Sequence, residues 1–173
     1  MIQKIVLIFV SVAGAVVIAS AYGAIHNLIT YQISPEYFTR FKFFQFGLTK
    51  IMMPEILKAM YVGVLASWWM GVFIGGVVGC ELIFARPQFR ARYYVLASII
   101  ILICAILGAM TFDHIVIDYT MYFLPPNVTD VASFYLVGSI HNGSYAGGFI
   151  GTIIAVLVLP ILILRSGKEK ADQ

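Results

Sequence analysis

The chain contains four apolar runs, each long enough to cross a lipid bilayer as an α-helix. A transmembrane helix needs about 20 predominantly apolar residues, because each residue adds about 1.5 Å of length and the hydrocarbon core is about 30 Å thick. Only 11% of the 173 residues are charged, whereas soluble domains carry about a quarter. The sequence therefore predicts an all-α membrane protein, folded as a single transmembrane domain over residues 1–173. Its predicted spans are about 5–31, 56–84, 93–112 and 132–164.

A short interfacial helix is predicted after the first span, at about residues 35–46. Ser34 supplies a capping hydroxyl, and Glu36 places an acid near the positive end of the helix dipole. The segment continues as YFTRFKFFQFG, in which aromatic side chains are interrupted by two cations. This pattern is typical of a helix that lies in the headgroup layer. A plain connector with an aromatic belt is the alternative interpretation.

The distribution of charge predicts which side of the membrane each loop occupies. Segment 85–92 contains three arginines, and the tail after residue 164 contains three Lys or Arg residues. Segment 113–131 has three aspartates and neither Lys nor Arg, which suits the opposite side. Segment 32–55 departs from this pattern, because it carries three cations on the outside. By the positive-inside rule, we expect both termini in the cytoplasm.

Two of the predicted spans carry glycine at every fourth position. Small residues on one stripe of a helix let two backbones approach closely, which is a main device for packing helices in lipid. We expect the stripe of span 56–84 to pack against that of span 132–164 within one chain. A contact between copies, in a homo-oligomer or a larger membrane complex, is the alternative. The expected packing residues are Gly71, Gly75, Gly79, Gly143, Gly147 and Gly151.

His141 is the most conspicuous polar residue, because it lies inside the last apolar run. It follows Asp130 by about ten residues, which places it roughly 15 Å into the helix. An ionisable side chain at this depth is costly unless it has a partner, so it is a functional-site candidate by default. The predicted topology puts all three histidines in the outer half of the membrane. We expect a pocket there that also includes Tyr22, Trp68, Ser144 and Tyr145.

A metal site is the first hypothesis for these polar residues. Imidazoles with a carboxylate suit zinc, iron or copper, and two axial histidines suit haem. The sequence has neither an HExxH nor a CxxC motif, so the ligands would have to come from separate helices. The candidate ligands are His26, Glu36, Asp113, His114 and His141.

Other interpretations of the same residues stay open. Without metal, they can form a ligand pocket or a proton path, or His141 can simply bridge two helices. His114 is best explained as an interfacial residue in water. The alternative function is a non-enzymatic membrane subunit or a channel-like homo-oligomer, and a membrane hydrolase comes third. The lipid bilayer is the expected partner, and nothing indicates nucleic-acid binding.

Three short motifs resemble a family of small, uncharacterised bacterial membrane proteins. Residues 22–39 read YGAIHNLITYQISPEYFT, residues 68–71 read WWMG and residues 141–145 read HNGSY. Asn27 departs from the family pattern, which tends to have aspartate at that place. The resemblance implies no known activity, but it implies a bacterial inner-membrane protein. It also suggests that His26, Glu36, Trp68 and His141 belong to one site.

Overall fold

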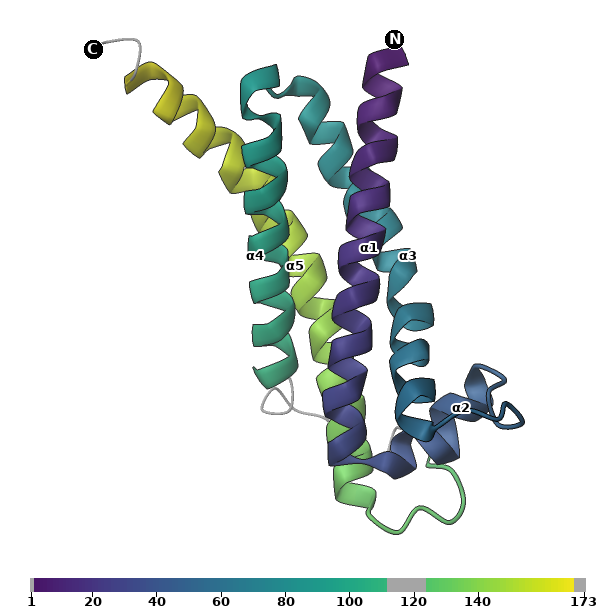
Figure 1. The fold of residues 1–173 in the computed structure, drawn as a ribbon. Helices are drawn as coiled ribbons and strands as arrows, with labels where there is room; N and C mark the ends of the chain where they lie inside the picture. Colours follow the sequence, from purple (N-terminus) through teal and green to yellow (C-terminus); the bar gives the residue numbers. More distant parts are fainter. Residues whose placement is uncertain (1, 112–123, 170–173) are drawn as a thin grey trace.

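The computed structural model shows a bundle of four long helices that run alternately up and down (Figure 1). It describes residues 2–111 and 124–169. In hydrocarbon, a backbone must satisfy its own hydrogen bonds, so apolar segments of this length become helices. All four helices are long and apolar enough to span a membrane, which confirms the predicted fold class. They are α1 Ile2–Ile33, α3 Glu55–Phe84, α4 Arg90–Thr111 and α5 Val131–Glu169.

The predicted short helix after the first span is confirmed, although its hydrogen bonding is unusual. It consists of the π-helical turn η1 (Tyr37–Lys42) followed by α2 (Phe43–Gln45). The backbone N–H of Tyr37 lies 3.3 Å from Oγ of Ser34, so the capping hydroxyl is used as the sequence indicates. At the other end of the bundle, the turn η2 (Pro87–Phe89) joins α3 to α4.

The first tightly packed helix pair is formed by α1 and α3, which lie side by side and antiparallel (Figure 1). Glycines of α3 face the α1 backbone directly. A Cβ atom built on Gly71 would lie 2.5 Å from Cα of Val16, and one built on Gly75 would lie 2.6 Å from Cα of Val12. Side chains at these positions would push the two helices apart, so the glycines set the spacing of the pair.

The second pair is formed by α4 and α5, which use the same device. A Cβ atom on Gly147 would lie 3.0 Å from Cα of Ala105, and one on Gly151 would lie 2.9 Å from Cα of Ile101. Contacts between the two pairs are much sparser than contacts within them. The bundle is therefore two helix pairs laid against each other.

The prediction that the two glycine stripes pack against each other is wrong. The stripe of α3 is covered by α1, and the stripe of α5 is covered by α4. Spacing by four residues shows that a helix has a smooth face, but it does not show which neighbour will use that face. Both stripes are consequently occupied by helices of the same chain.

An aromatic core fills the end of the bundle that carries η1 and α2. It brings the short helix against the start of α3 and the first turns of α5. Phe38 and Val137 are fully buried at its centre. This core packs the short helix against His141 of α5, whose ring meets those of Tyr37 and Phe38. Its buried members are Tyr37, Phe38, Phe43, Leu48, Ala59, Val62, Phe134 and Val137.

Candidate functional site

A buried hydrogen-bond bridge joins the two helix pairs through Asn27 and His141. Nε2 of His141, on α5, lies 2.8 Å from Oδ1 of Asn27, on α1. Nδ2 of Asn27 donates in turn to the carbonyl oxygen of Ala59, on α3, at 3.0 Å. Asn27 is 2% exposed and His141 is 8% exposed. Three helices are thus tied together by one amide and one imidazole.

The partners of His141 constrain where its protons are. Its Nδ1 lies 2.7 Å from the carbonyl oxygen of Val137, which can only accept a hydrogen bond. The bond from Asn27 to Ala59 orients the amide so that its oxygen faces Nε2. A neutral imidazole carries one ring proton and would leave the other nitrogen facing an oxygen. Which of the two contacts the ring donates to depends on its tautomer.

Aromatic rings surround His141 on several sides. The ring of Tyr37 stacks on it, with centroids 5.2 Å apart and an interplanar angle of 25°. Phe38 approaches at 6.1 Å, and His26 meets it edge to face at 4.8 Å. These ring contacts bury the imidazole and fix its orientation. The interfacial helix therefore supplies one wall of the site.

His26 lies beside this bridge but takes no part in it. Its Nε2 atom is buried, and no hydrogen-bond partner reaches it from the described residues. A buried polar atom without a partner costs about 1–3 kcal/mol, so such atoms usually mark a missing water, ion or ligand. This atom distinguishes His26 from His141, whose two ring nitrogens both face oxygen atoms.

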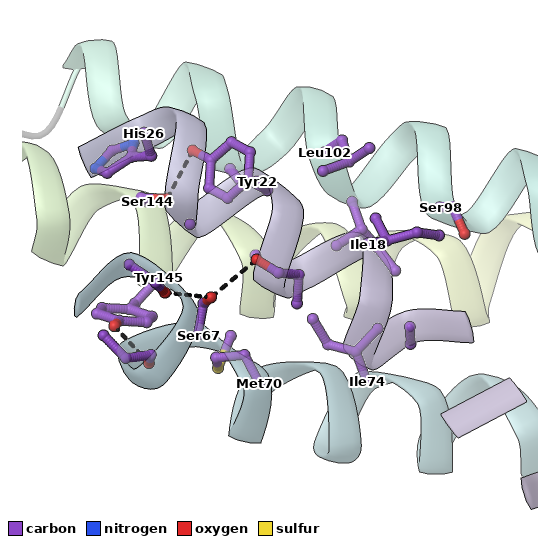
Figure 2. A pocket seen from close by; sticks show the side chains of 18 of the residues that line it. Ile18, Tyr22, His26, Ser67, Met70, Ile74, Ser98, Leu102, Ser144 and Tyr145 are labelled. Carbon is purple, nitrogen blue, oxygen red and sulfur yellow. Dashed lines mark hydrogen bonds between the residues drawn. The ribbon is translucent and has the colours of Figure 1, made fainter. Parts of the chain in front are cut away.

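A second polar contact between α1 and α5 lies one turn away. The hydroxyl groups of Tyr22 and Ser144 are 2.8 Å apart, and Figure 2 shows the two side chains pointing toward each other. Tyr145 donates from the next position to the carbonyl oxygen of Ala66, at 2.9 Å. Of the predicted pocket residues, the structure therefore brings Tyr22, Ser144 and Tyr145 together with both histidines.

A cavity of about 90 Å³ lies between the helix pairs, beside these residues. Each of the four long helices contributes to its wall (Figure 2). His26, Tyr22 and Ser144 lie toward one end, and Tyr94 and Ser98 of α4 line the cavity farther along, while the rest of the wall is largely apolar. Residues such as Ile18, Met70, Ile74 and Leu102 form that apolar part.

A second hollow opens on the outer face of the bundle, between α1, α4 and α5. Its volume is about 620 Å³, and apolar side chains dominate its lining. Two of those side chains, Ile29 and Met110, are 59% and 69% exposed, so the groove opens on the surface of the bundle. Tyr22 and His26 line both this groove and the inner cavity. The two residues thus lie between an internal space and the surface groove.

Glu36, a predicted metal ligand, is engaged in a different contact. Its carboxylate accepts hydrogen bonds from the backbone N–H groups of Thr129 and Asp130 and from the Thr129 hydroxyl, at 2.9–3.1 Å. These bonds, led by the one from Asp130, hold the pKa of Glu36 below its usual value. The residue ties the end of α1 to the segment that precedes α5.

The structure does not assemble the predicted set of metal ligands. Among the described residues, no group of three or more His, Cys, Asp or Glu side chains is close enough to hold a metal ion. His26 and His141 do meet, but Glu36 is bound to Thr129 and Asp130. Asp113 and His114 lie outside the described residues.

Trp68, the remaining predicted pocket residue, is 48% exposed. At this level the cavity wall is formed by its neighbours Ser67 and Met70. The adjacent Trp69 is the one that reaches the site region, with its ring 5.8 Å from that of Tyr145. Adjacent residues on a helix point about 100° apart, which accounts for the different surroundings of the two tryptophans.

Comparison with known proteins identifies no relative. No protein-family model, no curated protein and no solved structure matches this chain. The resemblance of its motifs to a bacterial membrane family therefore stays a prediction. Functional conclusions rest on the geometry of the site.

Two site residues, Asn27 and Tyr37, were absent from the predicted set. Asn27 is an amide in the middle of an apolar run, directly after His26, and a buried amide needs partners as much as a buried imidazole does. Tyr37 was assigned to the interfacial helix by its aromatic neighbours, and nothing in the sequence shows that its ring would stack on His141.

Proposed function

We propose that this protein binds a membrane-soluble molecule between its two helix pairs, with a small polar head placed at His26 and Tyr22. The unpartnered Nε2 atom of His26 carries this proposal. That atom belongs to a residue that lines both the inner cavity and the surface groove. A ligand dissolved in the bilayer can therefore approach it without passing through water.

The walls of the two hollows indicate the class of ligand. They are mostly apolar, which suits a hydrocarbon chain, and His26 and Tyr22 place polar groups where the two hollows meet. An imidazole nitrogen donates or accepts according to its tautomer, and a tyrosine hydroxyl does both. A head with one hydroxyl or one carbonyl group complements this pair. We therefore favour an uncharged lipophilic alcohol or carbonyl compound.

Photolabelling in proteoliposomes tests the proposal. The probe is a long-chain alcohol that carries a diazirine next to its hydroxyl group, and mass spectrometry locates the labelled peptides after irradiation. We expect labelling of the α1 segment around Tyr22 and His26 and of the α5 segment around Ile140 and Ser144. Excess unlabelled alcohol should abolish it. The variant His26→Leu should reduce it by about three- to tenfold, because one hydrogen bond to the head is lost.

A matched control replaces Ile99, an exposed apolar residue of α4 that lines neither hollow. Ile99→Leu should leave the labelling pattern unchanged. Uniform labelling of the lipid-facing sides of all four helices, insensitive to His26→Leu, would refute a specific site.

Other parts of the functional interpretation also stand as proposals. A bound transition metal or haem remains a prediction, which elemental analysis of the purified protein would test. A channel-like homo-oligomer remains a prediction as well, but the glycine stripes that motivated it face helices of the same chain. We further propose a bacterial inner-membrane location with both termini in the cytoplasm, on the charge of the loop 85–92.

A further inference from the structure

Lys58 is a nearly buried cation that lacks an acidic partner. It lies in the first turn of α3 and is 9% exposed. No hydrogen bond or ion pair reaches its ammonium group from the residues that the structure describes, and its nearest recorded neighbour is the ring of Phe43, at 5.7 Å. The positive end of the helix dipole adds to the unfavourable charge at this place. Such a position calls for an anion.

The neighbouring acids are already engaged. Glu55 lies three residues before Lys58, but its carboxylate accepts a hydrogen bond from Tyr31 at 2.7 Å. The carboxylate of Glu36 is held by Thr129 and Asp130. Neither carboxylate lies within ion-pair distance of Lys58.

Lys42 adds a second cation without an acidic partner, on η1. Its ammonium donates to the amide oxygen of Gln45 at 3.0 Å and lies over the ring of Phe41 at 4.7 Å. Partial burial lowers the pKa of Lys42 to about 8. The interfacial helix and the start of α3 thus present two cations for which this part of the chain offers no counter-charge.

The segments that carry these cations also carry exposed apolar side chains. Phe44 and Met52 are 79% and 102% exposed, and Leu57 is 48% exposed. Apolar residues beside cations are typical of a surface that enters the headgroup layer, with the charges at the level of the phosphates. An occupant from the membrane fits this surface better than one from water.

We propose that the surface formed by η1, α2 and the first turn of α3 binds phosphate headgroups of anionic phospholipids, with Lys58 and Lys42 each supplying a cation. The cations pair with the phosphate oxygens, while the exposed apolar side chains contact the acyl chains. Since the site lies outside the cavity at His26, it does not depend on the ligand proposed above.

Native mass spectrometry of the full chain tests this site. The protein is released from nanodiscs that contain a mixture of phosphatidylglycerol and phosphatidylcholine, and bound phosphatidylglycerol is counted. We expect the wild type to retain it, and both Lys58→Met and Lys42→Met to weaken retention by about fivefold, the effect of one cation at a membrane surface. Lys58→Arg should restore retention, because it keeps the charge.

Lys50→Met is the matched control, since Lys50 is an exposed cation on the same side of the membrane. It should change retention by less than about twofold, because exposed charges are strongly screened. Equal losses in Lys50→Met and Lys58→Met would show diffuse attraction and overturn the site.

A second experiment tests whether the bound group is free phosphate and not a lipid headgroup. Inorganic phosphate is added to the protein in nanodiscs of phosphatidylcholine alone. If phosphate alone binds and phosphatidylglycerol does not displace it, the assignment to a lipid is wrong.

Discussion

His26 and His141 come from the first and the last long helix, yet their imidazole rings meet edge to face with centroids 4.8 Å apart. The two rings differ in how many of their nitrogen atoms have hydrogen-bond partners. Both ring nitrogens of His141 lie at hydrogen-bond distance from oxygen atoms, whereas Nε2 of His26 has no partner among the described residues. One histidine therefore joins the helix pairs, and its neighbour keeps a buried ring nitrogen without a partner in the described part of the chain.

This difference predicts unequal effects on stability when each histidine is replaced by phenylalanine. His141→Phe leaves the buried oxygen of Asn27 without a donor, and we expect a loss of about 1–3 kcal/mol. His26→Phe removes no hydrogen bond of the ring, keeps the aromatic contact and eliminates a buried nitrogen without a partner, so it should leave stability unchanged or raise it by up to about 1–3 kcal/mol. Reversible unfolding in mixed detergent micelles measures both values. Equal destabilisation by the two variants would contradict the assignment of His141 as the bridging residue.

The close approach of α1 and α3 predicts that alanine is not tolerated where the backbones touch. A Cβ atom on Gly63 would lie 2.8 Å from the backbone nitrogen of Ala24, on α1. Gly63→Ala should therefore destabilise the protein by about 1–3 kcal/mol, as overpacking does elsewhere. Gly76 is the matched control on the same helix, because a Cβ atom there would meet nothing within 4 Å. Gly76→Ala should be neutral or stabilising by up to about 1 kcal/mol, from helix propensity alone.

The bilayer explains why the helices could be predicted and their pairing could not. Hydrocarbon forces an apolar run to become a helix of a known length, so the predicted spans agree with the four helices within a few residues at nearly every boundary. Pairing depends on which smooth faces meet. Gly63 was not among the predicted packing residues, although it continues the stripe at the same spacing of four, and it contacts Gly23 of α1. The stripe thus indicates a smooth face, but nothing in it shows that α1 would cover that face.

The site was partly predictable for a similar reason. Depth in the membrane indicated that His26, His141, Tyr22 and Ser144 lie at one level, and the structure brings them together. Depth alone does not fix the direction of a side chain. The sequence also predicted Glu36 as part of this site, but its carboxylate accepts a hydrogen bond from the backbone N–H of Thr129 instead.

Glu36 also predicts how stability depends on pH. Its hydrogen bonds, led by that from the Asp130 N–H, depress the pKa of the carboxyl in the folded protein. The charged form is therefore favoured by folding. The resulting stabilisation is fully present above the unfolded pKa of about 4.3 and is lost as pH falls through the lower folded value. Glu36→Gln should lose this dependence, so its unfolding free energy should change less between pH 6 and pH 3 than that of the wild type.

Thermal unfolding followed by circular dichroism across this pH range measures the effect. Glu81→Gln serves as the control, because Glu81 is an acid near the opposite end of α3. The control should follow the wild-type profile. If Glu36→Gln follows it too, the contact between Glu36 and the segment before α5 does not contribute to stability.

The hydroxyl contact between Tyr22 and Ser144 is best tested by a double-mutant cycle. The two oxygen atoms are 2.8 Å apart and connect α1 to α5, so the contact joins helix pairs that otherwise touch sparsely. We expect Tyr22→Phe and Ser144→Ala each to destabilise the protein, and the double variant to lose less than their sum. The difference should be about 0.5–1.5 kcal/mol, the net value of one hydrogen bond. If the two losses simply add, the hydroxyl groups do not stabilise each other, and this contact does not help to join the helix pairs.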